Sequence, residues 1–149
     1  MAKYENQSGT VLGAIEEAKS VAEYLRDQLQ EWLDNLPESL QGGEKADALQ
    51  EAIDQLEEGI SKLEDAEGSD QQAVLDYAIT YSQVVYPKST YMSRAKQLEV
   101  AICGLGGVPS EMPDDLEIPE DDRDDADEVF NNVSEALDAL QSVEFPAMC

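Results

Sequence analysis

The sequence contains no histidine and only two cysteines, Cys103 and Cys149. Without histidine, the chain lacks the commonest general base and the commonest metal-ligating side chain. Neither cysteine stands in a CxxC or other metal-binding spacing, and two cysteines are too few for a disulfide framework. Triads built on histidine, zinc-finger sites and disulfide scaffolds are therefore excluded.

Basic residues are also scarce, with 9 lysines and arginines against 34 acids and a net charge of −25. This balance disfavours contact with nucleic acid or with an anionic membrane and makes a basic protein the natural partner. The sequence has no apolar run long enough to span a membrane, and MAKYENQSGT lacks the pattern of a signal peptide. We therefore expect a cytoplasmic protein, in the host cytoplasm if it is phage-encoded.

What the sequence does have is helical periodicity, most clearly in residues 44–67. Apolar side chains recur there at alternating steps of three and four, which places them on one face of a helix. Acids follow the same register on another face, and only Lys45 and Lys62 oppose the nine acids of the segment. The apolar face consists of Ala46, Leu49, Ile53, Leu56, Ile60 and Leu63, and the acidic row of Asp47, Glu51, Asp54, Glu58 and Asp65.

A second long helix is expected before this one, capped by Thr10 and running to about Leu36. Pro37 and two glycines then break the pattern, so residues 8–67 are predicted to form a long antiparallel helical hairpin. Gly59 lies inside the helix at 44–67, where glycine costs about 1 kcal/mol relative to alanine. It either permits a close helix crossing or is simply tolerated.

Residues 69–105 are predicted to form a central apolar, tyrosine-rich helix pair, with one helix over about 70–86 and the next ending near Leu105. Residues 77–98 contain no acid but hold four of the six tyrosines. Either this segment lies inside the bundle with a small basic edge, or it forms an interface for a partner or a homodimer, because tyrosine combines large area with a polar tip. The tyrosines of this second interface are Tyr77, Tyr81, Tyr86 and Tyr91.

Residues 108–122 read as an acidic connection with three prolines, and residues 123–143 as a C-terminal helix. At 149 residues and 42% hydrophobic content, the chain fits one helical domain over 1–149. The predicted fold class is all-α, a compact antiparallel bundle of four to five helices.

Carboxylates are the only abundant reactive groups, so an enzyme of this composition would need a metal or an acid/base pair of carboxylates. Glu51/Asp54, Glu64/Glu67 and Glu135/Asp138 have the i, i+3 spacing of all-α nucleotide pyrophosphohydrolases, but such pairs arise by chance among 34 acids. The acidic connection lacks the glycine of a calcium loop, and GLGG lacks the lysine of a phosphate loop. We therefore expect no enzyme activity, no metal and no cofactor.

The leading hypothesis is a non-enzymatic inhibitor whose carboxylates replace phosphates on a basic nucleic-acid-binding surface of a partner enzyme or regulator. In physical type the chain resembles DNA-mimic proteins, which are typical of phage and mobile elements that disarm host restriction or CRISPR systems, although no motif assigns it to one family. The candidate partner-binding residues are Asp47, Glu51, Asp54, Glu58, Asp65, Asp114, Asp115, Glu117, Asp121, Asp122, Asp124 and Asp125.

Two alternatives stay open. One is a helical oligomeric structural or adaptor protein that uses its apolar and tyrosine-rich faces, and the other is adaptation to high salt. Salt adaptation spreads acids over every exposed face, whereas a DNA mimic needs them contiguous. The mimic hypothesis therefore gains if residues 44–67 and 111–128 fold side by side, and loses if they lie on opposite faces.

Overall fold

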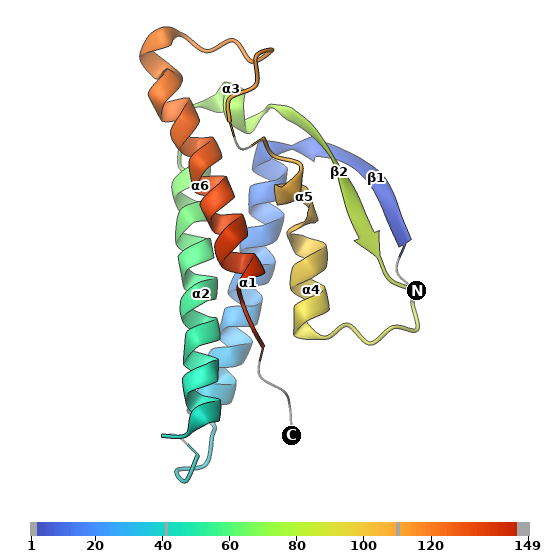
Figure 1. Cartoon of the computed structure of the whole chain (residues 1–149), viewed down its shortest axis with the longest axis vertical. Helices are drawn as coiled ribbons and strands as arrows, with labels where there is room; N and C mark the ends of the chain where they lie inside the picture. Colours follow the sequence, from blue (N-terminus) through green and yellow to red (C-terminus); the bar gives the residue numbers. More distant parts are fainter. Residues whose placement is uncertain (1–2, 41, 110, 146–149) are drawn as a thin grey trace.

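The computed structural model describes residues 3–40, 42–109 and 111–145. Three long helices form its main layer, and a two-stranded ribbon with shorter helices lies against one of them (Figure 1). In chain order the elements are β1 (Lys3–Thr10), α1 (Val11–Asp34), α2 (Glu44–Glu67), α3 (Gln72–Leu75), β2 (Ala78–Val85), α4 (Arg94–Ala101), α5 (Cys103–Gly106), the 3-10 helix η1 (Glu120–Asp122) and α6 (Arg123–Gln141).

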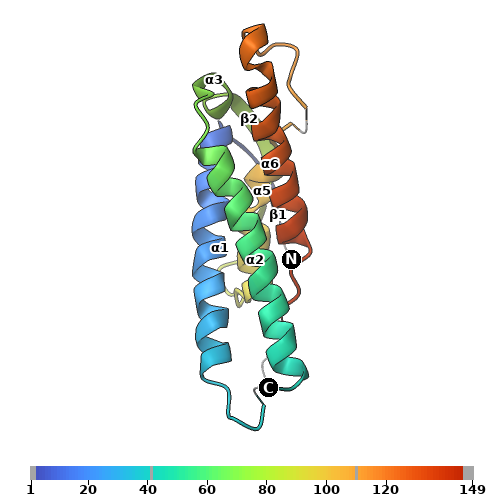
Figure 2. The same cartoon turned by 90° about the vertical axis from the view of Figure 1, so that its left-hand side faces the viewer.

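Helix α2 is the middle member of the main layer. It runs antiparallel to α1 on one side and antiparallel to α6 on the other, as the two views in Figures 1 and 2 agree. Helices α4 and α5 pack mainly against α1, and the ribbon packs mainly against α5, on the side of the molecule away from α2. The segment 8–67, predicted as a helical hairpin, contains the antiparallel helices α1 and α2, with α2 at the expected bounds, while residues 8–10 belong to β1.

Local signals fix the ends of these helices. Thr10 caps α1 through its side chain, which accepts a hydrogen bond of 3.1 Å from the backbone N–H of Gly13. Pro37 lies beyond the end of α1, and Gly43 is the residue before the first turn of α2. The connection between them is short, and so the two helices return side by side.

One continuous hydrophobic core joins the main layer to the other elements. The periodic face predicted for α2 is buried along its whole length, which confirms that prediction. Phe130 of α6 is fully buried and is among the largest side chains of the core. Other fully buried large side chains are Ile15, Leu25, Leu29, Leu49, Ile53, Leu56, Leu63, Leu105 and Leu140.

The prediction of an all-α bundle is wrong. The described residues are 61% helical, but β1 and β2 form an antiparallel two-stranded sheet, which makes the fold a mixture of helix and strand. The register is unbroken from the pair Lys3 and Val85 to the pair Thr10 and Ala78. The first of these strands, β1, directly precedes the helix that the sequence predicts to be capped by Thr10.

The helix expected over 70–86 is the source of the error. Only the four residues of α3 are helical there, and the next residues form β2. Ile79, Thr80 and Val84 are β-branched, and Tyr81 is aromatic, and such residues fit a pleated, half-buried surface better than a helix. Their burial alternates along part of the strand, with Ile79 and Tyr81 facing the core.

The remaining boundaries are close to expectation. The helix expected to end near Leu105 begins at Arg94, where the Ser93 side chain accepts from the N–H of Lys96, and it divides into α4 and α5. The acidic connection is irregular until η1, and α6 ends two residues before the predicted Val143.

Candidate functional site

The acidic row of α2 lies on the surface of the molecule. Asp47, Glu51, Asp54, Glu58 and Asp65 are all exposed, whereas the apolar side chains of the same helix are buried. Their steps of four, three, four and seven residues keep them on one stripe of the helix. Asp54 accepts a hydrogen bond of 2.9 Å from Gln50, a contact within the same surface.

Helix α6 places a second set of acids beside this stripe. Near the C-terminal end of α2, Asp65 lines one surface depression together with Asp125 and Glu128. One to two turns earlier, Glu58 lines another with Glu135 and Asp138. The acidic face defined by these contacts comprises Asp47, Glu51, Asp54, Glu58 and Asp65 of α2 and Asp125, Glu128, Glu135 and Asp138 of α6.

Lys62 sits within the acidic face and makes an ion pair with Glu135, with 2.8 Å between Nζ and Oε2. The pKa of Lys62 is raised because its ammonium group bonds to the Glu135 carboxylate, and because Asp65 and Glu58 add negative charge nearby. Among the described residues, this is the one ion pair on the acidic face. Most of its carboxylates are therefore left for a partner's cations.

The charge density of the acidic face approaches that of a nucleic acid. From Asp47 to Asp65 the face is about 27 Å long, at ~1.5 Å of helix per residue. Nine carboxylates over this length amount to roughly one per 3 Å, and a single DNA strand carries one phosphate per ~3.4 Å. A basic groove that accommodates one strand would therefore meet a similar number of negative charges here.

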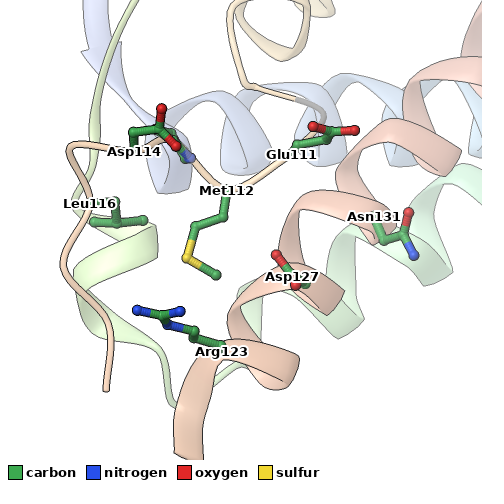
Figure 3. Close-up of a pocket in the computed structure, with 8 residues that line it drawn as sticks. Glu111, Met112, Asp114, Leu116, Arg123, Asp127 and Asn131 are labelled. Carbon is green, nitrogen blue, oxygen red and sulfur yellow. The ribbon is translucent and has the colours of Figure 1, made fainter. Parts of the chain in front are cut away.

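The acidic connection does not join the acidic face as a whole. Its first part folds over α6 and encloses a depression of about 620 Å³ lined by Glu111, Met112, Pro113, Asp114, Leu116, Arg123, Asp127 and Asn131. Figure 3 shows Met112 from the connection and Arg123 and Asp127 from α6 around this space. Arg123 donates from Nε to the carbonyl of Ile118, a buried residue that anchors the connection.

The predicted partner-binding residues therefore fall into two groups. Asp114 and Glu117 line a depression beside Arg123, and Asp115 accepts from the hydroxyl of Tyr77. At the other end of the connection, Asp121 and Asp122 lie in η1, and Asp124 and Asp125 in the first turn of α6. Acids at that position also favour the positive end of the helix dipole, which gives them a structural role.

Three residues of the acidic face were missed as partner-binding residues in the sequence: Glu128, Glu135 and Asp138. The sequence did carry a signal for them. Each of the three acids directly precedes an apolar residue of α6, so each lies at the border of the buried stripe of that helix. The sequence does not show which helix lies beside α2, and that neighbour decides which acids join the row.

Tyr77 ties the acidic connection to the start of β2, with 3.0 Å between its hydroxyl oxygen and Oδ1 of Asp115. The pKa of Tyr77 is raised because the hydroxyl donates to this carboxylate, and because partial burial and the charge of Asp115 disfavour the phenolate. Its neutral form therefore stabilises the fold below about pH 10, and this contribution is lost as the pH rises through the raised pKa.

We expect Asp115→Ala to lower the midpoint of this ionisation towards 10.0, the ordinary value of tyrosine. The measurement is an ultraviolet titration of the phenolates, with Tyr77→Phe identifying the Tyr77 component. Asp114→Ala is the matched control, because Asp114 is exposed and adjacent but does not bond to Tyr77. Identical titrations for the two alanine variants would contradict the hydrogen bond between Tyr77 and Asp115.

The four tyrosines of the second interface do not gather on one surface. Tyr77 and Tyr86 flank opposite ends of β2, and Tyr86 donates to the carboxylate of Glu99 while Lys96 lies over its ring at 5.3 Å. Tyr81 packs into the core, and Tyr91 is 79% exposed. Three of the four tyrosines therefore make contacts within the chain through their hydroxyl group or their ring.

No group of three or more His, Cys, Asp or Glu side chains in the described ranges is arranged to hold a metal ion. In the same ranges, no helix is both long and apolar enough to cross a membrane. No protein-family model, no curated protein and no solved structure matches the chain. The acidic face is therefore the site with the strongest physical argument of its own.

Proposed function

We propose that this protein is a non-enzymatic inhibitor that binds a basic nucleic-acid-binding surface of a partner protein and blocks it. The observation that carries the proposal is the meeting of acids from α2 and α6 on one continuous face. Two segments separated by almost 60 residues contribute to it, as a DNA mimic requires. Their carboxylates would attract the partner over long range and then occupy the positions of phosphates.

The distribution of charge over the rest of the molecule supports the proposal over uniform adaptation to salt. The ribbon, β1 and β2 together, contains one lysine and one glutamate, and residues 77–98 contain no acid. In Figure 1 the ribbon, which has no net charge, lies opposite the layer formed by α2 and α6. The ribbon is thus nearly free of acids, whereas α1, α2 and α6 each expose several of them.

The test is a pull-down with the full chain as bait, washed in a gradient from roughly 0.1 to 1 M salt, over which the Debye length falls from about 10 to 3 Å. We expect capture of a nucleic-acid-binding protein that elutes as salt rises and that added duplex DNA displaces. A captured protein that DNA does not displace, or that stays bound at 1 M salt, would contradict a mimic acting through its charge.

A further inference from the structure

We infer that the outer edge of β1 is a self-association site, where a second copy of this chain adds its own β1 to make a four-stranded antiparallel sheet. This inference is independent of the proposed function. It starts from the exposure of β1, all eight residues of which are exposed. In the described residues β1 pairs with β2 alone, and it is the outermost strand in Figure 1.

The hydrogen-bond alternation identifies which backbone groups of β1 are unpaired. The N–H of Val11 donates to the carbonyl of Tyr77 at 3.1 Å, one step beyond the last ladder pair and in the same register. In an antiparallel pair, residues whose backbone N–H and C=O groups bond to the partner strand alternate with residues whose backbone groups point away from it. Odd-numbered residues of β1 therefore face β2, and the N–H and C=O groups of Tyr4, Asn6 and Ser8 point away from it.

The two edges of the ribbon differ. On β2, the carbonyl of Val84 accepts from the side chain of Gln83 at 3.2 Å, and that amide also donates to Val100 in α4. The carbonyl of Thr80 lies against Gly107, so close that a Cβ there would be 2.6 Å from the oxygen. Within the described ranges, the chain thus covers the outer edge of β2 with its own residues and leaves that of β1 open.

Sheet edges that stay unpaired usually carry a feature that prevents pairing with another chain, such as proline, a bulge, inward charges or a very short strand. β1 has eight residues, an unbroken register and no proline. Its charges, Lys3 and Glu5, lie at one end, and residues 6–10 carry none. An edge of this kind is built for pairing, and a two-stranded sheet gains stability from further strands.

Charge selects a second copy as the occupant. A basic peptide would be drawn to the acidic face, since the ribbon has no net charge to attract it. For two chains of −25 each, approach through the ribbon keeps the acidic faces apart, because they lie on the opposite side (Figures 1 and 2). Like charges make every other approach more repulsive.

The strand is also self-complementary. A two-fold axis through Asn6, perpendicular to the sheet, pairs Tyr4 with Ser8 of the second copy and Ser8 with its Tyr4. These are the residues whose backbone groups point outward. In this register Lys3 lies opposite Gly9 and Glu5 opposite Gln7, so no like charges face each other across the new pair.

The association is expected to strengthen with salt, because the two bodies repel each other and salt screens that repulsion. Sedimentation equilibrium in 0.05 and 0.5 M NaCl should show a monomer–dimer equilibrium with at least a roughly tenfold lower dissociation constant at the higher salt. Binding through the acidic face has the opposite salt dependence, so failure of one proposal is distinguishable from failure of the other.

Hydrogen exchange of the unaltered protein locates the interface. Protection of the amides of Tyr4, Asn6 and Ser8 should rise with protein concentration, while those of Glu5 and Gln7 are protected throughout by β2. Ser8→Pro removes one outward N–H and should give a monomer, whereas Ser8→Thr keeps the N–H and should still dimerise. A monomer at millimolar concentration in 0.5 M NaCl, or a dimer without added protection at Asn6 and Ser8, would overturn the inference.

Discussion

Replacing Asp47, Glu51, Asp54 and Glu58 together by lysine should abolish binding of the partner captured through the acidic face. These are four of the five α2 carboxylates of that face and all are exposed, so their replacement leaves the buried side of α2 intact. A single exposed charge contact changes affinity by at most about fivefold. Four reversals that also introduce repulsion should weaken binding by roughly 100-fold or more, as measured by titration calorimetry with the purified partner.

A matched control separates this face from net charge. Reversing Glu16, Glu17, Asp27 and Glu31 on α1 to lysine changes the formal net charge of −25 by the same amount, and these acids are also exposed. The control should bind within a few fold of the unaltered chain. Equal losses in both variants would mean that total charge, and not the acidic face, controls binding. Retained binding in the α2 variant would move the interface off this face altogether.

The long helices could be predicted because their signals are local. The apolar face of α2 repeats through the whole helix, and a capping threonine and chain-breaking residues mark the ends of the hairpin. Burial of that face then follows from the hydrophobic effect alone, whichever helix covers it. This explains why the elements that form the main layer were predicted and α6 was placed to within a few residues.

The ribbon could not be predicted because β1 has no local signal. KYENQSGT is polar and exposed at every position, so no alternation of apolar residues indicates a strand. It becomes a strand only because β2, more than 60 residues later, offers a partner in register. In β2 itself, a short apolar run fits either a helix or a strand. Its β-branched residues favour the strand, but the spacing of its apolar residues also matched a helical period, and the helix was predicted.

The sequence indicated the kind of candidate site, an acidic surface, but not which residues form it. Clusters of acids can be read from the sequence, yet their arrangement depends on which helices are neighbours. Burial of Ile118 draws the connection over α6 and takes Asp114, Asp115 and Glu117 away from the α2 row. The antiparallel packing of α6 on α2 brings in other acids that the sequence left unassigned.

Gly59 controls how closely these two helices approach, and its replacement should have a large effect on stability. A Cβ at this position would lie 2.6 Å from Cδ2 and 2.8 Å from Cγ of Leu140, and 3.5 Å from the carbonyl of Ala136. Leu140 is fully buried and has little room to move. Of the two roles open for Gly59 in the sequence, the close helix crossing is therefore the one the packing supports.

We expect Gly59→Val to destabilise the fold by about 1–3 kcal/mol through overpacking, despite the better helix propensity of valine. For a chain of this size, thermal denaturation should show a fall in Tm of about 3–10 °C. Gly42→Val is the matched control, because no atom of the described residues lies within 4 Å of a Cβ at that exposed loop position. The double variant with Leu140→Ala should lose less stability than the sum of the two single losses, since Leu140→Ala removes the atoms in conflict.

The same substitution tests the acidic face. Because Gly59 lies one residue after Glu58, forcing α6 away at this point separates Glu58 from Glu135 and Asp138, which line a common depression. If Gly59→Val folds, it should weaken partner binding with every carboxylate still present, because the two acidic rows no longer lie at the spacing that a basic groove matches. An unchanged Tm together with unchanged binding would mean that α2 and α6 do not meet at Gly59, and the acidic face would then reduce to the row of α2 alone.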